Sequence, residues 1–126
     1  MPLARLKFRT YPDRSDEYGE LEHAIEMLQH LIAEHLSCTD PNGGLVADDV
    51  DIEVFEAGPL DRSKYDVELS FAAMAFPLRM ADIETRCQRV FNDFVKLLPA
   101  CYTKPFLWFV PAAGAVFIDK VVEIAD

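Results

Sequence analysis

The sequence lacks the features of nucleic-acid-binding, exported and membrane-spanning proteins. It has 12 Lys and Arg against 22 Asp and Glu, a formal charge of −10, whereas phosphate backbones are bound by clustered cations. No apolar run approaches the ~20 residues that a membrane helix needs. The opening residues MPLARLKFRTY contain no apolar block of a secretory signal. We therefore expect a cytoplasmic, acidic protein whose partners include neither a membrane nor a nucleic acid.

Cysteine is also scarce, and its spacing fits none of the common metal or redox motifs. Cys38, Cys87 and Cys101 are an odd number at wide intervals, without the CxxC pairs of zinc or redox sites. Reduced, packed thiols are typical of such residues. Cys87 lies on the apolar stripe of a predicted helix, where we expect it to be inert.

The three histidines do not form a metal site. His23, His30 and His35 all fall on one predicted helix, without the HExxH spacing of zinc enzymes. His23 and His30 share a face but lie ~10 Å apart along the helix axis, which is too far for one metal ion. His35 lies beside the apolar stripe, where we expect a packed, hydrogen-bonded side chain. The sequence therefore predicts no metal.

Motifs for phosphate binding and nucleophilic catalysis are absent as well. The chain contains no GxxxxGK, GxGxxG or GxSxG. Gly43 and Gly44 follow Pro41 and Asn42 in CTDPNGG, a composition typical of a turn. We expect no cofactor.

What the sequence does contain is one hydrophobic pattern that occurs twice. Residues 3–10, 50–56 and 65–71 alternate between apolar and polar side chains, which predicts strands. PFLWFV, residues 105–110, is continuously apolar, as in a strand covered on both faces or buried in an interface. Two series of apolar residues recur every three or four positions, as on one face of a helix. The first is Leu21, Ile25, Leu28, Ile32 and Leu36, and the second is Ile83, Cys87, Val90, Phe94 and Leu97.

This order predicts a single α+β domain over residues 1–126, with pseudo-repeats at about 1–58 and 64–126. Right-handed crossovers in βαββαβ place two helices on one face of a four-stranded mixed sheet. In a ferredoxin-like sheet the first strand lies between the third and fourth, whereas in the alternative arrangement it lies between the second and third. Residues 115–124 are apolar enough for one more short strand, but periodicity leaves their state open.

Charge favours the second arrangement. The polar side of the first predicted strand is cationic, and the polar sides of the second and third are acidic. The residues concerned are Arg5, Lys7 and Arg9, then Asp51 and Glu53, then Asp66 and Glu68. Opposite charges on neighbouring strands contribute roughly 0.2–1 kcal/mol each, and like charges cost as much. A cationic strand flanked by two acidic ones indicates that the first strand lies between the second and third.

Pro2 is the remaining candidate for chemistry. Initiator methionine is normally removed before a small residue such as proline, which would leave a secondary amine at the start of the first strand. Burial and nearby cations favour the unprotonated form of such an amine. In that form it can act as a general base on a carbon acid or as a nucleophile toward a carbonyl.

Met1-Pro2 leading into a strand, the βαββαβ order and the chain length together resemble the tautomerase superfamily, whose sheet has the second arrangement. Residues 51–98, with KYDVELSFAAMAFPLRMADIETRCQRVFNDFVKLL, are most similar to 5-carboxymethyl-2-hydroxymuconate isomerase. The resemblance implies that Pro2 is the catalytic base and that Arg79 of FPLRMADIETR binds a substrate carboxylate. It also implies a homotrimer, in which PFLWFV would occupy an interface. The family's second substrate-binding arginine falls in LVADDVDIEV, where this chain has acids instead.

Three hypotheses follow. The first is a cofactor-independent tautomerase or isomerase acting on a small enol or keto carboxylic acid, with Pro2 as base and Arg79 on the carboxylate. The second is a ferredoxin-like interaction module whose acidic surface and aromatic residues, such as Trp108 and Phe109, meet a protein partner. The third is a tautomerase fold that has lost its activity.

Overall fold

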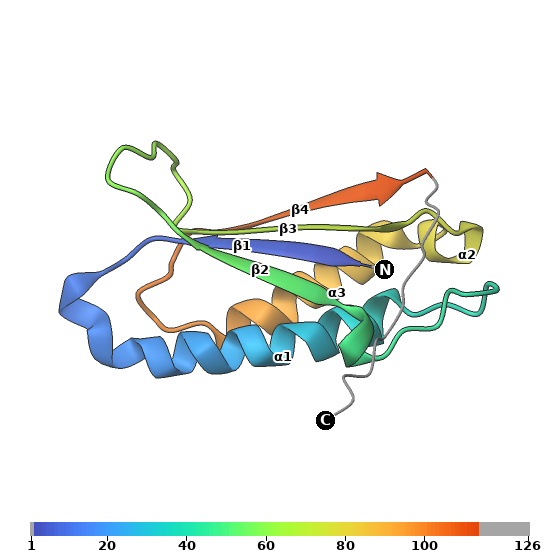
Figure 1. The fold of residues 1–126 in the computed structure, drawn as a ribbon, viewed down its shortest axis with the longest axis horizontal. Helices are drawn as coiled ribbons and strands as arrows, with labels where there is room; N and C mark the ends of the chain where they lie inside the picture. Colours follow the sequence, from blue (N-terminus) through green and yellow to red (C-terminus); the bar gives the residue numbers. More distant parts are fainter. Residues whose placement is uncertain (1, 114–126) are drawn as a thin grey trace, which may run out of the picture.

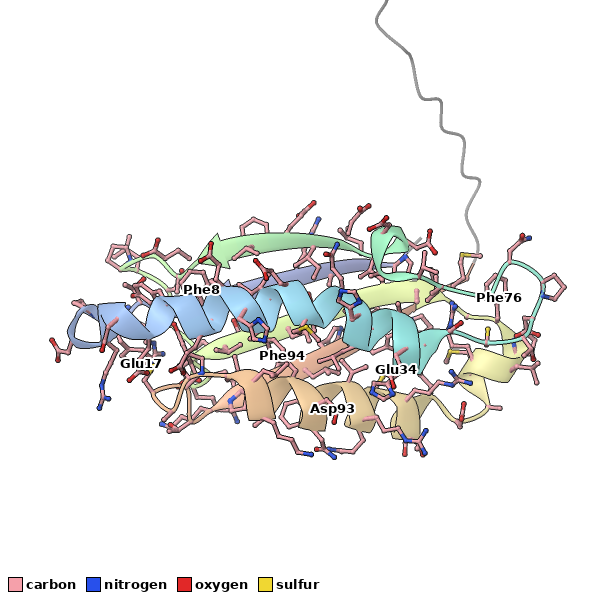
Figure 2. All side chains as sticks on the ribbon, turned by 90° about the horizontal axis from the view of Figure 1, so that it is seen from below. Phe8, Glu17, Glu34, Phe76, Asp93 and Phe94 are labelled. Carbon is pink, nitrogen blue, oxygen red and sulfur yellow. The ribbon has the colours of Figure 1, made fainter. Side chains whose placement is uncertain are left out.

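The alternating segments fold into a sheet, and the two apolar stripes fold into helices that cover one face of it (Figure 1). The computed structural model describes residues 2–113. Its long elements are β1 (Leu3–Phe8), α1 (Tyr18–Leu36), β2 (Asp51–Glu56), β3 (Val67–Met74), α3 (Ile83–Leu97) and β4 (Pro105–Ala112). Figure 2 shows α1 and α3 side by side over the sheet. The predicted α+β class, with two long helices on one face of a mixed sheet, is confirmed.

The strand order decides between the two arrangements. It is β2-β1-β3-β4, with β1 parallel to β2, β1 antiparallel to β3, and β3 parallel to β4. The first strand therefore lies between the second and third, as the charge pattern predicted, and the ferredoxin-like alternative is wrong. As a consequence β1, which begins at Leu3, has a neighbouring strand on each side.

The core lies between the sheet and the two helices. Leu6 of β1 and Leu69 of β3 point toward the helices, and Leu28 and Ile32 of α1 and Phe94 of α3 point toward the sheet; each is at most 2% exposed. Burying a side chain of this size contributes ~1.5–3 kcal/mol relative to leaving it in water. These contacts fix the helices on one face, and within residues 2–113 no helix covers the other face of the sheet, which we call the uncovered face.

Part of the predicted charge pairing occurs. Arg5 Nε lies 3.2 Å from Glu53 Oε2, across β1 and β2. Lys7 stands opposite Glu68 in register, but its Nζ pairs at 3.0 Å with Asp61 of the β2–β3 connection. Such exposed pairs contribute at most ~1 kcal/mol each, so strand order is decided jointly by charge and by the apolar face.

The expectation that Asp66 lies on the polar side of a strand is wrong. The strand β3 begins at Val67, and Asp66, just before it, is buried, 3% exposed. It accepts hydrogen bonds from the Tyr11 hydroxyl at 3.2 Å and from the backbone N–H groups of Thr103 and Lys104 at 3.0 and 3.1 Å. A buried carboxylate requires such partners. Asp66 therefore ties together the connections at one end of the sheet.

Three short helices were not anticipated. They are the 3₁₀ helix η1 (Pro12–Glu17), the 3₁₀ helix η2 (Ala47–Asp49) and the one-turn helix α2 (Pro77–Met80). Residues 115–124, considered above as a further strand, lie outside the described residues. Within residues 2–113, none of the helices combines the length and the apolar character needed to cross a bilayer.

Candidate functional site

Pro2 stands at the head of a central strand. Its side chain is buried, and its carbonyl accepts a hydrogen bond from the Asp51 backbone N–H at 3.0 Å. On the other side of β1, Leu3 pairs with Ala72 near the end of β3. Figure 1 shows that this end of the sheet is also where α2 lies. We call the group formed by Pro2, the start of β2, the end of β3 and α2 the Pro2 end.

Arg79, on α2, belongs to the same end but faces inward. The residue is 2% exposed. Its Nε donates to Leu36 O at 2.7 Å, its Nη1 to Met74 O at 2.8 Å and its Nη2 to Gly43 O at 3.0 Å. The guanidinium thus joins the end of α1, the end of β3 and the connection after α1. The structure brings Arg79 and Pro2 to one end of the sheet, and the hydrogen bonds described for Arg79 are to backbone carbonyls.

Burial is the main influence on the charge of this guanidinium. Desolvation lowers the pKa of Arg79 from its ordinary value, Cys38 opposes that shift, Arg86 adds to it and Asp40 opposes it. A guanidinium nevertheless stays protonated in proteins. Three carbonyl oxygens and the Phe76 ring, 5.2 Å from Arg79 Cζ, take the place of water around a permanent cation.

The connection between α1 and η2 is shaped around these contacts. Asp40 Oδ2 accepts from the Leu78 backbone N–H at 2.9 Å, and it thereby supplies the N-terminal cap that the N-cap residue of α2, Phe76, does not provide. Asn42 has a φ of 64°, a left-handed conformation that asparagine tolerates. At Gly43, an added Cβ would lie 2.3 Å from Cys38 Sγ, so the tight turn requires glycine. The predicted turn at CTDPNGG is confirmed, and it places the Gly43 carbonyl within hydrogen-bond distance of Arg79.

A second arginine caps the same helix end. Arg86 Nη1 donates to His35 O at 2.9 Å and to Ser37 O at 2.7 Å, while its Nε pairs with Asp82 at 2.6 Å. Cations near the last carbonyls of a helix are stabilised by the helix dipole. Arg79 and Arg86 therefore act together on the C-terminus of α1.

The chain that enters β2 at the Pro2 end is acidic. Asp48 and Asp51 are exposed, and Asp49 accepts a hydrogen bond from the Val46 backbone N–H at 2.9 Å. Asp51 directly neighbours Pro2 through the backbone hydrogen bond described above. This is the segment where the resemblance led to the expectation of a second arginine, and carboxylates occupy it instead.

A hollow at the opposite end of the sheet has no counterpart in the sequence reasoning. It has a volume of about 590 Å³ and lies under the β2–β3 connection, with Arg9, Glu56, Ser63 and Tyr65 among its lining residues. Arg9 Nη2 donates to Ser63 O at 2.9 Å, and Glu56 accepts from the Thr10 hydroxyl. Its polar groups are thus engaged with one another. A mixed set of exposed charges carries no sequence signal of a site.

The uncovered face of the sheet carries exposed aromatic and aliphatic side chains. Trp108 and Val110 of β4 are 58% and 46% exposed, and Phe55 of β2 is 47% exposed. The Phe106 ring stacks on Tyr65, with centroids 4.5 Å apart. Within residues 2–113, therefore, β4 is covered by the helices on one face only, and the predicted cover for its second face does not come from this part of the chain.

The other residues considered in the sequence have structural surroundings. His35 Nε2 lies 2.9 Å from Asp93 Oδ2, so the expected packed, hydrogen-bonded histidine is confirmed; Figure 2 labels Asp93 on α3, facing α1. Burial raises the pKa of the Cys87 thiol, as expected for an inert cysteine. Among the described residues, no three His, Cys, Asp or Glu side chains are grouped as metal ligands would be.

Comparison with known proteins finds similarity at the level of the fold only. No protein-family model and no curated protein matches the sequence. MIF2 of Leishmania major is similar with a TM-score of 0.49 and 11% identity over 93% of each chain. A wild-type fused 4-OT, itself an asymmetric trimer, has a TM-score of 0.49 and 8% identity over 87% of this chain and 85% of that one. A macrophage migration inhibitory factor homologue from Prochlorococcus marinus has a TM-score of 0.37 and 18% identity over 87% and 90%. None of these similarities identifies a ligand or a reaction for this chain.

Proposed function

We propose that this protein is a cofactor-independent keto–enol isomerase in which Pro2 is the general base. The observation that carries the proposal is the position of Pro2, which is buried at the head of a central strand, with a hydrogen bond to β2 on one side and β3 on the other. A strand held on both sides fixes its first residue more firmly than a free terminus. A fixed amine can be held at the proper distance from a substrate carbon.

The chemistry requires a secondary amine in its unprotonated form. Burial disfavours the ammonium form because it removes water from the charge. The unprotonated nitrogen takes a proton from the carbon next to a carbonyl, and the electron pair of the C–H bond moves to form the enolate. The proton then returns to the oxygen, or to another carbon of the conjugated system, and the base is regenerated. No electrons are exchanged with an outside group, so the reaction requires no redox cofactor.

The proposal can be tested by mass and by rate. The intact mass of the native protein should correspond to loss of Met1, because a retained methionine leaves no free amine on Pro2. Ketonisation of phenylenolpyruvate and of its methyl ester should be faster with the wild type than with Pro2→Ala. Equal rates for both compounds would remove Pro2 from the mechanism. Far-UV circular dichroism of Pro2→Ala should match the wild type, since the substitution removes no described side-chain hydrogen bond.

We also propose that the chain forms a homotrimer through the uncovered face of the sheet. Exposed aromatic residues are enriched at interfaces, and Trp108 is the largest on this face. Trp108→Glu should lower the mass measured by sedimentation equilibrium, whereas Leu60→Glu, on a connection and 84% exposed, should not. A wild type that sediments as a monomer would favour the second candidate, a non-catalytic interaction module that binds another protein through the same face.

A further inference from the structure

The group that the resemblance assigns to a substrate carboxylate is engaged inside the protein. All three nitrogens of the Arg79 guanidinium donate to backbone carbonyls, at 2.7–3.0 Å, and the residue is 2% exposed. Because the residue is 2% exposed, a carboxylate could reach the guanidinium only by displacing these carbonyls, one of which, Gly43 O, also accepts from the Cys38 backbone N–H at 3.0 Å. Leaving a buried carbonyl unpaired costs ~1–3 kcal/mol. Arg79 is therefore unsuited to bind an anion that arrives from solvent.

The next cation at this end is also engaged. Arg86 donates to two carbonyls and pairs with Asp82. The described residues that lead into β2 add negative charge, with exposed carboxylates at Asp48 and Asp51. Two like charges ~4 Å apart repel by ~1 kcal/mol in water and by ~4 kcal/mol at the effective dielectric constant of a protein surface. Within residues 2–113, an anionic substrate would thus meet repulsion from the chain that enters β2, and Arg79 and Arg86 are already engaged.

We propose that the Pro2 site selects uncharged carbonyl compounds over carboxylates, an inference that rests on the proposed function of Pro2. Arg79 is then a positioning residue: it fixes the connection after α1 and the end of β3 beside Pro2. The substrate class is an enolisable ketone, aldehyde or ester. The carboxylic acid that the resemblance implies would be a poor substrate, because the cation that should hold it is bound to Leu36, Gly43 and Met74.

Covalent labelling tests this selectivity without depending on turnover. Bromoacetone and bromopyruvate differ by a methyl group in place of a carboxylate, and both alkylate amines. The Pro2 nitrogen forms a bond to the CH₂ carbon, the C–Br bond breaks, and the amine loses its proton to buffer. Rates come from intact mass, and peptide mapping separates Pro2 from Cys38, Cys87 and Cys101. Each rate is divided by that of free prolinamide, which removes the intrinsic reactivity of the reagent.

The expected result is that the normalised rate with bromoacetone exceeds that with bromopyruvate by ~5-fold or more, as local negative charge lowers the concentration of an anion. Asp51→Asn should raise the bromopyruvate rate. The matched control Glu20→Gln makes the same charge change at the first turn of α1, at the far end of the molecule, and should leave that rate unchanged. A normalised ratio at or below one, or equal effects of the two variants, would overturn the inference.

Failure of the proposed function would give a different pattern of labelling at Pro2. If neither reagent labels Pro2, or both label it no faster than prolinamide, then Pro2 is not an activated base and both proposals fall. If both label Pro2 rapidly and bromopyruvate is preferred, Pro2 is activated but the substrate class is wrong. Rapid labelling with bromoacetone preferred supports both.

Discussion

Replacing Arg79 by methionine should destabilise the fold strongly while changing little of its shape. The substitution removes three hydrogen bonds from a charged donor, each worth ~1.5–3 kcal/mol, or ~5–9 kcal/mol together. It also removes the cost of burying a guanidinium, which is several kcal/mol. We expect the difference, a loss of ~2–4 kcal/mol in the free energy of unfolding. In a chain of this length, that loss lowers the melting temperature by roughly 8–15 °C.

The assay is urea unfolding followed by far-UV circular dichroism, with the slope of the transition compared between variants. Arg79→Lys should fall between wild type and Arg79→Met, because an ammonium keeps the charge but cannot direct planar donors to three separate carbonyls. Arg62→Met is the matched control: Arg62 is exposed, and it donates a 3.3 Å hydrogen bond to the neighbouring Asp61 carbonyl. It should change stability by less than ~0.5 kcal/mol.

One result would refute this reasoning. If Arg79→Met is as stable as the wild type and loses only its affinity for carboxylate compounds, the three carbonyls do not depend on the guanidinium. Arg79 would then be the substrate-binding residue that the resemblance implies, and the selectivity proposed for Pro2 would be lost with it.

Three further predictions concern stability. Gly43→Ala should cost ~1–3 kcal/mol, because its Cβ would overlap Cys38 Sγ at 2.3 Å; Gly44→Ala, with nothing within 4 Å, should be nearly neutral in the same urea assay. Asp66→Ala should lose ~2–4 kcal/mol, because it leaves three partly buried donors without this acceptor, and a loss below 1 kcal/mol would contradict its role. Burial raises the pKa of Cys101 from 9.0 to about 11. The Cys101 thiol therefore ionises at lower pH in the unfolded chain than in the folded chain. Its contribution to the free energy of unfolding is complete below about pH 9 and is lost as the pH rises to about 11. Cys101→Ala should flatten that part of the decline in unfolding free energy, and an unchanged slope would contradict it.

The fold could be predicted because its signals are local. Alternation and three-to-four spacing each involve neighbours along the chain, and α3 contains the whole predicted stripe from Ile83 to Leu97. Strand order was also accessible, since the cations of β1 require acidic neighbours, and Arg5 does pair with Glu53. The helix α2 was missed because one turn that starts at Pro77 is too short to show a period.

The surroundings of the charged residues could not be predicted in this way. Asp66 and Glu68 are two positions apart, so the alternating pattern placed both side chains on the polar side of a strand. In the structure β3 begins at Val67, and the Asp66 carboxylate, which precedes it, is buried. Arg79 is bound by carbonyls 43, 36 and 5 positions away along the chain. A residue whose partners are backbone groups leaves no pattern of side chains in the sequence, and Arg79 therefore looked like an available cation.

The two possible roles of Arg79 can be separated by kinetics even though both predict loss of activity on substitution. If the guanidinium contacts substrate, Arg79→Lys should raise KM for phenylenolpyruvate and leave the methyl ester unaffected, because only the acid has a group for it to bind. If the guanidinium positions the chain around Pro2, acid and ester should lose kcat in the same proportion, since the altered geometry is common to both. The hydrogen bonds to Leu36, Gly43 and Met74 favour the second outcome, and under the proposed function stability and activity at the Pro2 end would depend on the same three bonds.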